Sequence, residues 1–266
     1  MASDVAGETL LLTGEDVPPV HEYNAAGSSP FLFTCDHYGR LLPKRLGNLG
    51  LSKGELVRHI AFDIGIAGVA ERLARLLDAH LIAQPYSRLV IDCNRPPSTA
   101  SSIPRLSEAT LISGNEALSR EAAEQRRREI FDPYHDRIEA IIDRRLRERK
   151  ATALVSLHSF TPVYAGVARP WHIGTLYHRD KTLPPLLLKA LRSEGDLVVG
   201  DNEPYAVSDL TDYTIPVHGE MRGVVSTGIE IRQDLIADQP NQNLWAERLA
   251  RILAKTAAQL HASEMI

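Results

Sequence analysis

The sequence predicts an α/β fold, a three-layer sandwich in which helices cover both faces of a mixed, mostly parallel sheet. Short apolar runs of strand character alternate along the chain with longer stretches whose apolar residues recur at helical spacing. The chain has 266 residues, of which 44% are hydrophobic, so it can bury a large core without disulfides. It contains neither an internal repeat nor a Gly- and Ser-rich linker, so we expect one domain over residues 1–266.

The individual elements follow from local patterns. Strands are expected where short apolar runs end in polar or turn residues, at 9–13, 31–34, 81–83, 89–91, 153–157, 173–177, 197–199, 224–225 and 229–231. Helices are expected where apolar residues recur every three to four positions, at 58–79, 115–149, 183–193 and 242–262. Pro133 is expected to break or kink the second of these helices.

Composition excludes several classes of protein. The 30 basic and 34 acidic side chains give a net charge of −4, which argues against a nucleic-acid partner. No segment approaches 18 uninterrupted apolar residues, so no membrane-spanning helix is expected. Two cysteines, Cys35 and Cys93, cannot form a disulfide framework, and residues 1–4 lack the basic start of a signal peptide. We therefore expect a cytoplasmic protein.

Common catalytic fingerprints are missing from the sequence. It has no G-x-S-x-G elbow, no phosphate-binding G-x-x-x-x-G-K-[ST] loop, no G-x-G-x-x-G motif and no H-E-x-x-H motif. The sequence therefore lacks the motifs that usually identify a nucleotide-binding protein, a dinucleotide-dependent enzyme or a serine hydrolase.

Four titratable residues are placed where a parallel sheet exposes its ligand site. His37 and His158 each follow an expected strand, Asp63 lies at the start of an expected helix, and Glu230 stands between two isoleucines in a strand. Two histidines and one carboxylate, with one position left open, form the ligand set of a catalytic zinc ion. A further carboxylate beside that set can act as a general base.

Alternatives remain open for each of these residues. His59 lies one helical turn before Asp63 and is a second candidate ligand. Each histidine can instead be a hydrogen-bonded structural group. Glu230 can be a structural carboxylate paired with Arg232 or another cation. Cys35 stands two residues before His37, which also allows a thiol mechanism.

A second polar cluster surrounds the expected strand 89–91. Arg88 precedes that strand, and Asn94 and Arg95 follow it. Arginine binds carboxylates in bidentate fashion, so the cluster suits an acidic small molecule. The alternative interpretation is an ion pair between Asp92 and one of the two arginines.

Five sequence blocks occur in one order over residues 28–258. They are Asp36-His37-Tyr38-Gly39 with Pro43, His59-Ile60-Ala61-Phe62-Asp63-Ile64-Gly65, Ser87-Arg88-Leu89-Val90-Ile91-Asp92-Cys93-Asn94-Arg95, Leu157-His158-Ser159-Phe160 and Glu230-Ile231-Arg232-Gln233-Asp234-Leu235-Ile236. Together they resemble the N-formylglutamate amidohydrolase family. One departure is Asp36, because family members commonly have an apolar residue or proline before the first histidine.

The resemblance implies a metal-dependent hydrolase of acylated amino acids, with a zinc-exopeptidase-like fold similar to zinc carboxypeptidases and cell-wall amidases. It implies one zinc or other divalent ion per chain, and N-formylglutamate, a small anionic N-acyl amino acid, as substrate. The implied roles are metal ligands for His37, Asp63 and His158, general base for Glu230, and substrate binding for Arg88, Asn94 and Arg95. Another N-acyl or peptide-like amide, an inactive binding protein on the same fold, and a homo-oligomer all stay open.

Overall fold

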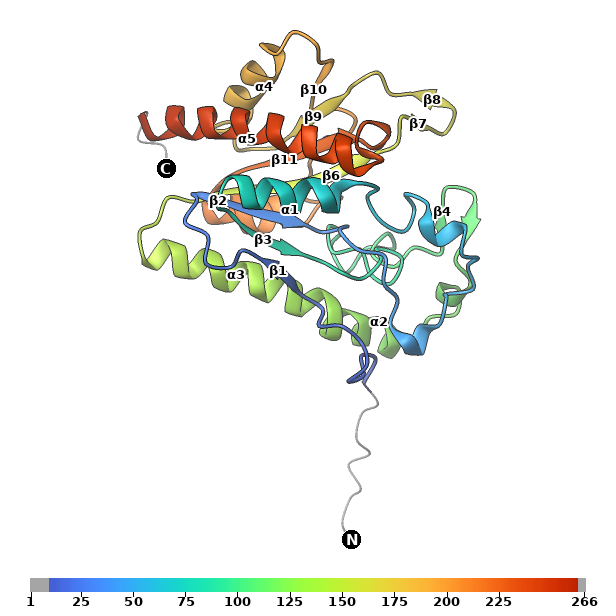
Figure 1. The fold of residues 1–266 in the computed structure, drawn as a ribbon. Helices are drawn as coiled ribbons and strands as arrows, with labels where there is room; N and C mark the ends of the chain where they lie inside the picture. The colour runs from blue at the N-terminus through green and yellow to red at the C-terminus, as the bar shows by residue number, and fades with distance from the viewer. Residues whose placement is uncertain (1–9, 263–266) are drawn as a thin grey trace.

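The computed structural model describes residues 10–262 and is built around a seven-stranded sheet with the order β1-β3-β2-β6-β11-β9-β10 (Figure 1). These strands are β1 His21–Tyr23, β2 Phe31–Cys35, β3 His80–Ala83, β6 Ala153–Phe160, β9 Ile173–Leu176, β10 Val199–Asp201 and β11 Val225–Arg232. Strands β3, β2, β6 and β11 run parallel to one another, whereas β1 and β9 pair antiparallel to their neighbours β3 and β11. The sheet is therefore mixed and mostly parallel, as predicted.

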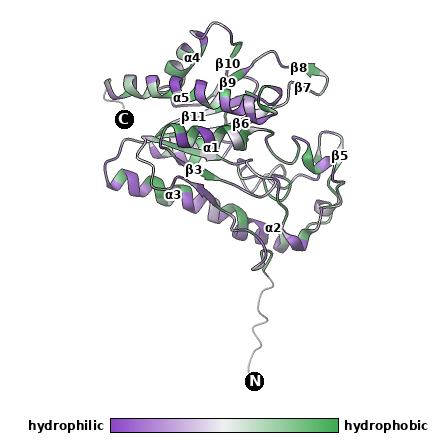
Figure 2. Ribbon diagram, viewed as in Figure 1, coloured by the Kyte–Doolittle hydropathy of each residue, from purple (hydrophilic) through white to green (hydrophobic). Residues whose placement is uncertain are grey.

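Helices cover both faces of this sheet (Figure 1). On one face lie α1 Ile66–Leu76, α4 Pro184–Arg192 and α5 Gln239–Ala262, and on the other lies α3 Asp132–Arg147, preceded by α2 Arg120–Arg126. Hydrophobic and hydrophilic residues alternate along these helices, as expected when one side packs on the sheet (Figure 2). The three-layer sandwich predicted from the sequence is confirmed.

Shorter elements complete the described chain. Two small hairpins pair β4 Leu106–Ser107 with β5 Thr110–Leu111 and β7 Val163–Tyr164 with β8 Val167–Ala168. The 3-10 turns are Lys44–Leu46, Glu55–Val57, Ser113–Asn115, Glu220–Arg222 and Gln233–Ile236, and the π-helical turns are Arg127–Phe131 and Ile215–Gly219. Between residues 10 and 262, no helix combines the length and apolar composition needed to cross a bilayer.

Alternation along the central strands separates the core from the polar side of the sheet. On β11, Ile229 and Ile231 are fully buried in the apolar cluster formed with α1 and α5. Val155 and Leu157 of β6 belong to the same cluster. Successive side chains of a strand point to opposite faces, so Glu230, between the two isoleucines, faces the layer that contains α3.

The segment before α1 differs from the prediction. The sequence predicts a helix over 58–79, but α1 begins only at Ile66. Gly65 has a φ of +80°, and a Cβ at this position would collide with the carbonyl oxygen of Ile236. This left-handed glycine separates the helix from the preceding turns, so Asp63 lies in a loop and not in the first helical turn.

The expected strand at 89–91 is also wrong, because the chain turns there. The Val90 amide donates to the Ser87 carbonyl at 2.9 Å, and the Ser87 hydroxyl accepts from the Leu89 amide at 3.2 Å. Such local serine contacts compete with strand pairing. Arg88 and Asp92 consequently stand four residues apart on a turn and their side chains meet.

The other predicted helices and strands differ less from the observed ones. The helix expected from 115 begins at Arg120 and continues through the π-helical turn Arg127–Phe131, with Pro133 tolerated in the first turn of α3. The strands expected at 224–225 and 229–231 are one continuous strand, β11. No strand forms over residues 10–13 of the segment expected at 9–13, and Thr9 lies outside the described residues.

Candidate active site

Two histidines and an aspartate converge at the carboxyl ends of the central strands. His37 Nδ1 and His158 Nδ1 are 3.2 Å apart, and both lie close to Asp63 Oδ2, at 3.4 and 3.0 Å respectively. All three side chains are buried, and their ligand atoms fall within 4.8 Å of one another. The structure thus brings together the three residues predicted as metal ligands.

Strand register accounts for much of this arrangement. His158 lies near the end of β6, beside Glu230 on the parallel strand β11. His37 follows the end of β2, which pairs with the other edge of β6. Asp63 joins them from the loop before α1, where its amide donates to the His37 carbonyl at 3.0 Å and its Oδ2 accepts from the Ser159 amide at 3.2 Å.

The far nitrogen of His37 is held by an aspartate. His37 Nε2 lies 2.7 Å from Asp92 Oδ1. A carboxylate whose pKa is lowered accepts hydrogen bonds only, and burial of Asp92, which opposes ionisation, is outweighed by Arg88 and His37, which lower its pKa. The Nε2 hydrogen therefore points to Asp92, which leaves the Nδ1 lone pair facing the cluster.

The tautomer of His158 follows from a short hydrogen-bond chain. The Ser156 hydroxyl donates its one hydrogen to Asp36 Oδ2 at 3.1 Å, so it accepts from His158 Nε2 at 2.9 Å. Asp36 Oδ2 itself lies 3.2 Å from the same nitrogen. Neutral His158 thus presents its Nδ1 lone pair to the space shared with His37 and Asp63.

These donors fit a divalent metal. Two imidazole lone pairs and a carboxylate oxygen converge on one space, and three acceptors at such distances require a cation or a proton between them. Burial lowers the pKa of His158, but Asp36 and Asp63 outweigh it and raise that pKa well above the usual value. Burial likewise opposes ionisation of Asp63, yet the two histidines hold its pKa well below its usual range.

Asp36 is a functional candidate whose role the sequence analysis did not assign. Its Oδ1 accepts from the hydroxyls of Tyr134 and Thr214, both at 2.8 Å. Burial would raise the pKa of this carboxyl, but His158 lowers it to about 2. The signal in the sequence was its departure from an apolar residue, since a buried carboxylate beside a candidate ligand needs partners.

Glu230 has the environment of a proton acceptor. It is 6% exposed, and among the described residues its Oε2 has no hydrogen-bond partner. Burial, followed by repulsion from Asp63, raises its pKa to about 7. The structural alternative of a pair with Arg232 does not form, because Arg232 binds Asp234 at 2.8 Å.

The second polar cluster, formed by Arg88, Asn94 and Arg95, divides into two parts. Arg88 donates to Asp92 Oδ2 from Nη2 at 2.6 Å and reaches Asp63 Oδ1 from Nη1 at 3.4 Å, so it lies against the candidate metal ligands. The ion pair considered as an alternative therefore exists, and it holds Arg88 at the site. Its side chain remains 23% exposed, so part of the guanidinium can meet a ligand.

Asn94 and Arg95 hold a neighbouring loop. Asn94 Oδ1 accepts from the amides of Tyr213 and Thr214, at 3.1 and 3.2 Å, while its amide group donates to Asp212 at 3.3 Å. Arg95 lies 3.6 Å from Asp212 and its side chain is 27% exposed. Both residues flank the site through this loop, and their role in substrate binding stays a prediction.

Two alternatives find no support in the geometry. His59 lies outside the cluster, with Nε2 3.1 Å from Glu108 Oε1. Cys35 is fully buried in the apolar cluster with α1 and α5, on the face of the sheet opposite to Glu230. Burial raises the pKa of its thiol.

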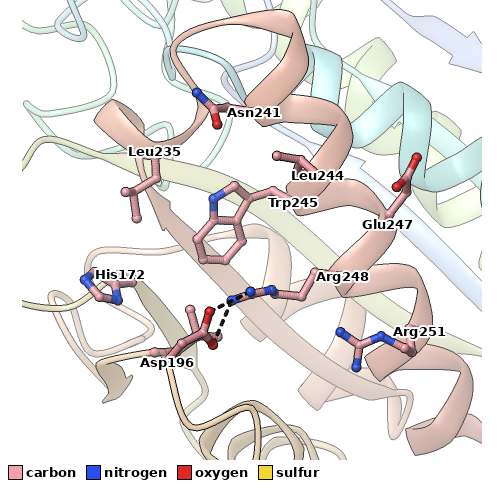
Figure 3. A pocket seen from close by; sticks show the side chains of 10 residues that line it. His172, Asp196, Leu235, Asn241, Leu244, Trp245, Glu247, Arg248 and Arg251 are labelled. Carbon is pink, nitrogen blue, oxygen red and sulfur yellow. Dashed lines mark hydrogen bonds and ion pairs between the residues drawn. The ribbon is translucent and has the colours of Figure 1, made fainter.

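A separate pocket of about 520 Å³ lies along α5 (Figure 3). In this pocket the Trp245 indole stands near the ion pair between Arg248 and Asp196, which measures 2.7 Å. None of the predicted site residues lines it.

Taken together, the fold and the cluster define an α/β protein with a buried set of metal-ligand side chains and a neighbouring carboxylate at the carboxyl ends of its parallel strands. The chain belongs to the N-formylglutamate amidohydrolase family, whose sequence pattern matches residues 29–237. The resemblance noted from the five sequence blocks is thereby confirmed.

The chain is also similar to individual proteins. An N-formylglutamate deformylase of Pseudomonas putida is 31% identical over 166 residues, a match that spans 56% of each chain. The solved structure of a gene product of Agrobacterium tumefaciens is 35% identical with a TM-score of 0.91, and the match covers 94% of this chain and 99% of the other. N-formylglutamate amidohydrolase of Ralstonia eutropha shares the fold, with a TM-score of 0.67 at 19% identity and coverage of 93% and 100%.

Proposed function

We propose that this protein is a zinc-dependent amidohydrolase that cleaves N-acyl amino acids, with N-formylglutamate as the leading substrate and glutamate and formate as products. The observation that carries the proposal is the convergence of His37, Asp63 and His158 beside Glu230, a buried carboxylate with an unpartnered oxygen among the described residues. The family and the name of the Pseudomonas putida relative support the choice of acyl group and amino acid.

His37, Asp63 and His158 would hold the metal, and Asp92 and the Ser156–Asp36 pair would fix the orientation of the two imidazoles. A bound zinc ion supplies Lewis-acid chemistry, lowering the pKa of water and polarising a carbonyl group. The ligand set also accepts other divalent ions, so zinc is the first choice and not the sole one.

Glu230 serves as the general base. It takes a proton from the attacking water and returns it to the nitrogen of the leaving amine, which lets one carboxylate assist both halves of the hydrolysis. In the metal-free protein burial raises the pKa of Glu230 to about 7, so its environment favours proton uptake by this carboxylate. Its position beside His158 in the register of β11 and β6 brings it to the metal ligands.

Arg88 and Arg95 bind the α-carboxylate that every N-acyl amino acid carries, and Asn94 donates to the same group. Arg88 is fixed by Asp92 before substrate arrives, so little side-chain entropy is lost on binding. A pre-oriented guanidinium suits bidentate binding of a carboxylate.

The test is a substrate panel on protein stripped of metal and reloaded with zinc. We expect formate release from N-formylglutamate and weaker turnover of N-acetylglutamate and of a muramoyl peptide. In Glu230→Gln each of these activities should fall by about 10²- to 10⁴-fold. Preferred turnover of another amide would replace the leading substrate. Stoichiometric zinc with no turnover across the panel would instead favour an inactive binding protein.

A further inference from the structure

A third arginine lies near the site, enclosed by aromatic rings. Arg169 follows β8 and is 9% exposed. Its guanidinium carbon lies 4.7 Å from the ring centre of Tyr164, 4.8 Å from that of Tyr205 and 5.9 Å from that of Phe160. Aromatic faces attract a cation electrostatically and hold its planar group in a fixed orientation.

This guanidinium faces no carboxylate from the described part of the chain. Arg169 Nη1 donates to the Tyr205 hydroxyl at 2.9 Å and to the Thr161 carbonyl at 3.5 Å. Within residues 10–262, no acidic side chain lies at ion-pair distance from it, whereas Arg88 and Arg95 both face aspartates. A nearly buried cation without a counter-ion is unfavourable in isolation, so it strongly favours an incoming anion.

The surroundings of Arg169 lie next to the candidate metal ligands. Phe160 stands two residues after His158 on the same face of β6, roughly 7 Å farther along the strand. Tyr205 is 44% exposed. Its pKa is raised by burial and also by the charges of Glu230 and Asp63, which shows that its hydroxyl lies within their electrostatic reach.

The length of a dicarboxylic substrate is similar to the distance from His158 to Phe160 along β6. In N-formylglutamate, five covalent bonds separate the acyl carbon from the side-chain carboxylate, a span of roughly 6 Å when extended. An acyl group placed at the cluster of His37, Asp63 and His158 would let that carboxylate extend along β6 to the level of Phe160, whose ring centre is 5.9 Å from the guanidinium carbon of Arg169.

We propose that Arg169 binds the side-chain carboxylate of the substrate and thereby makes the enzyme prefer N-acyl derivatives of acidic amino acids. Tyr205 positions the guanidinium through its hydroxyl. The inference rests on the proposed function and deepens it, because the α-carboxylate is common to all N-acyl amino acids while the second carboxylate is not.

The test compares N-formylglutamate with N-formylglutamine, which has the same shape and an uncharged side chain, in zinc-loaded wild type and Arg169→Met. We expect kcat/KM for N-formylglutamate to fall roughly 30- to 1,000-fold in the variant, mainly through KM, with N-formylglutamine changed less than about threefold. Arg169→Lys, which keeps the charge and loses the bidentate fork, should retain part of the preference.

Arg75→Met is the matched control, because Arg75 also lies on a tyrosine ring and donates to its hydroxyl, at 2.8 Å from Tyr23. It should leave both substrates unaffected. Equal losses for both substrates in Arg169→Met, with a lowered Tm, would assign Arg169 a structural role and overturn the inference. If Arg169→Met does not fold, an unchanged substrate preference in Arg169→Lys overturns it.

Failure of the proposed function would be visible separately. If wild type hydrolyses neither compound, calorimetric binding of both compounds to Glu230→Gln and to Glu230→Gln/Arg169→Met still tests Arg169. Loss of the preference for N-formylglutamate in the double variant supports the inference, and an equal preference in the two proteins overturns it.

Discussion

Replacing Glu230 with glutamine separates a catalytic carboxylate from a structural one. The substitution keeps the size of the side chain and removes its charge. In the metal-free protein, burial and Asp63 raise the pKa of Glu230 from 4.5 to about 7. The folded state therefore holds a proton on this group over a pH range in which the unfolded state has lost it.

The sign of the effect follows from proton linkage. Between pH 4.5 and about 7 the folded protein binds more protons than the unfolded chain, so the contribution of Glu230 to stability falls as the pH rises. At about 1.4 kcal/mol for each pH unit, the ionised carboxylate costs about 3 kcal/mol above pH 7. Glutamine does not titrate and avoids this cost.

The assay is denaturant unfolding of metal-free wild type and Glu230→Gln at pH 5 and pH 8. We expect the variant to be more stable by about 3 kcal/mol at pH 8, with most of that difference gone at pH 5. After zinc loading, turnover of the variant should fall by about 10²- to 10⁴-fold while zinc remains bound. A variant that is less stable than wild type at pH 8, with near-normal turnover, would refute the reasoning and make Glu230 structural.

Three further substitutions test the neighbouring groups. His158→Ala should lose the bound metal in elemental analysis, and one metal ion per chain retained in this variant would refute its role as a ligand. Asp36→Asn should weaken zinc binding by about 10- to 100-fold in a chelator competition, because the Ser156 hydroxyl and His158 lose their acceptor. Arg88→Met should lower kcat/KM for N-formylglutamate by roughly 30- to 1,000-fold. Equal wild-type activity on N-formylglutamate and its uncharged diamide would contradict recognition of carboxylates.

The sheet was predictable because its strands carry strong apolar signals. The runs at 31–34 and 153–157 are long enough and apolar enough to identify central strands, and both lie inside β2 and β6. The apolar run at 89–91 gives the same local signal but forms a turn. Its conformation depends on contacts with distant parts of the chain, such as the Ser87 hydroxyl on the Ala61 carbonyl at 2.7 Å.

The candidate site was predictable to the extent that its residues stand at strand ends. His37 and His158 were placed by that logic, and Glu230 was identified as a carboxylate between two isoleucines of a strand. The structure brings all three together with Asp63. Arg169 gave no such signal, because it follows a two-residue strand and its hydrogen-bond partner Tyr205 lies 36 residues farther along the chain. Spacing along the chain does not reveal a cation that is defined by what surrounds it.

The charge balance of the candidate site favours a bound divalent cation. Four carboxylates lie in or against the cluster and are nearly buried, namely Asp36, Asp63, Asp92 and Glu230. Arg88 offsets part of this negative charge through Asp92 and Asp63. His158 offsets a further part in the metal-free protein, since its raised pKa keeps a proton on it. A divalent cation would replace that proton and add a second positive charge, so the carboxylates that fix the imidazoles also favour the metal over the empty site.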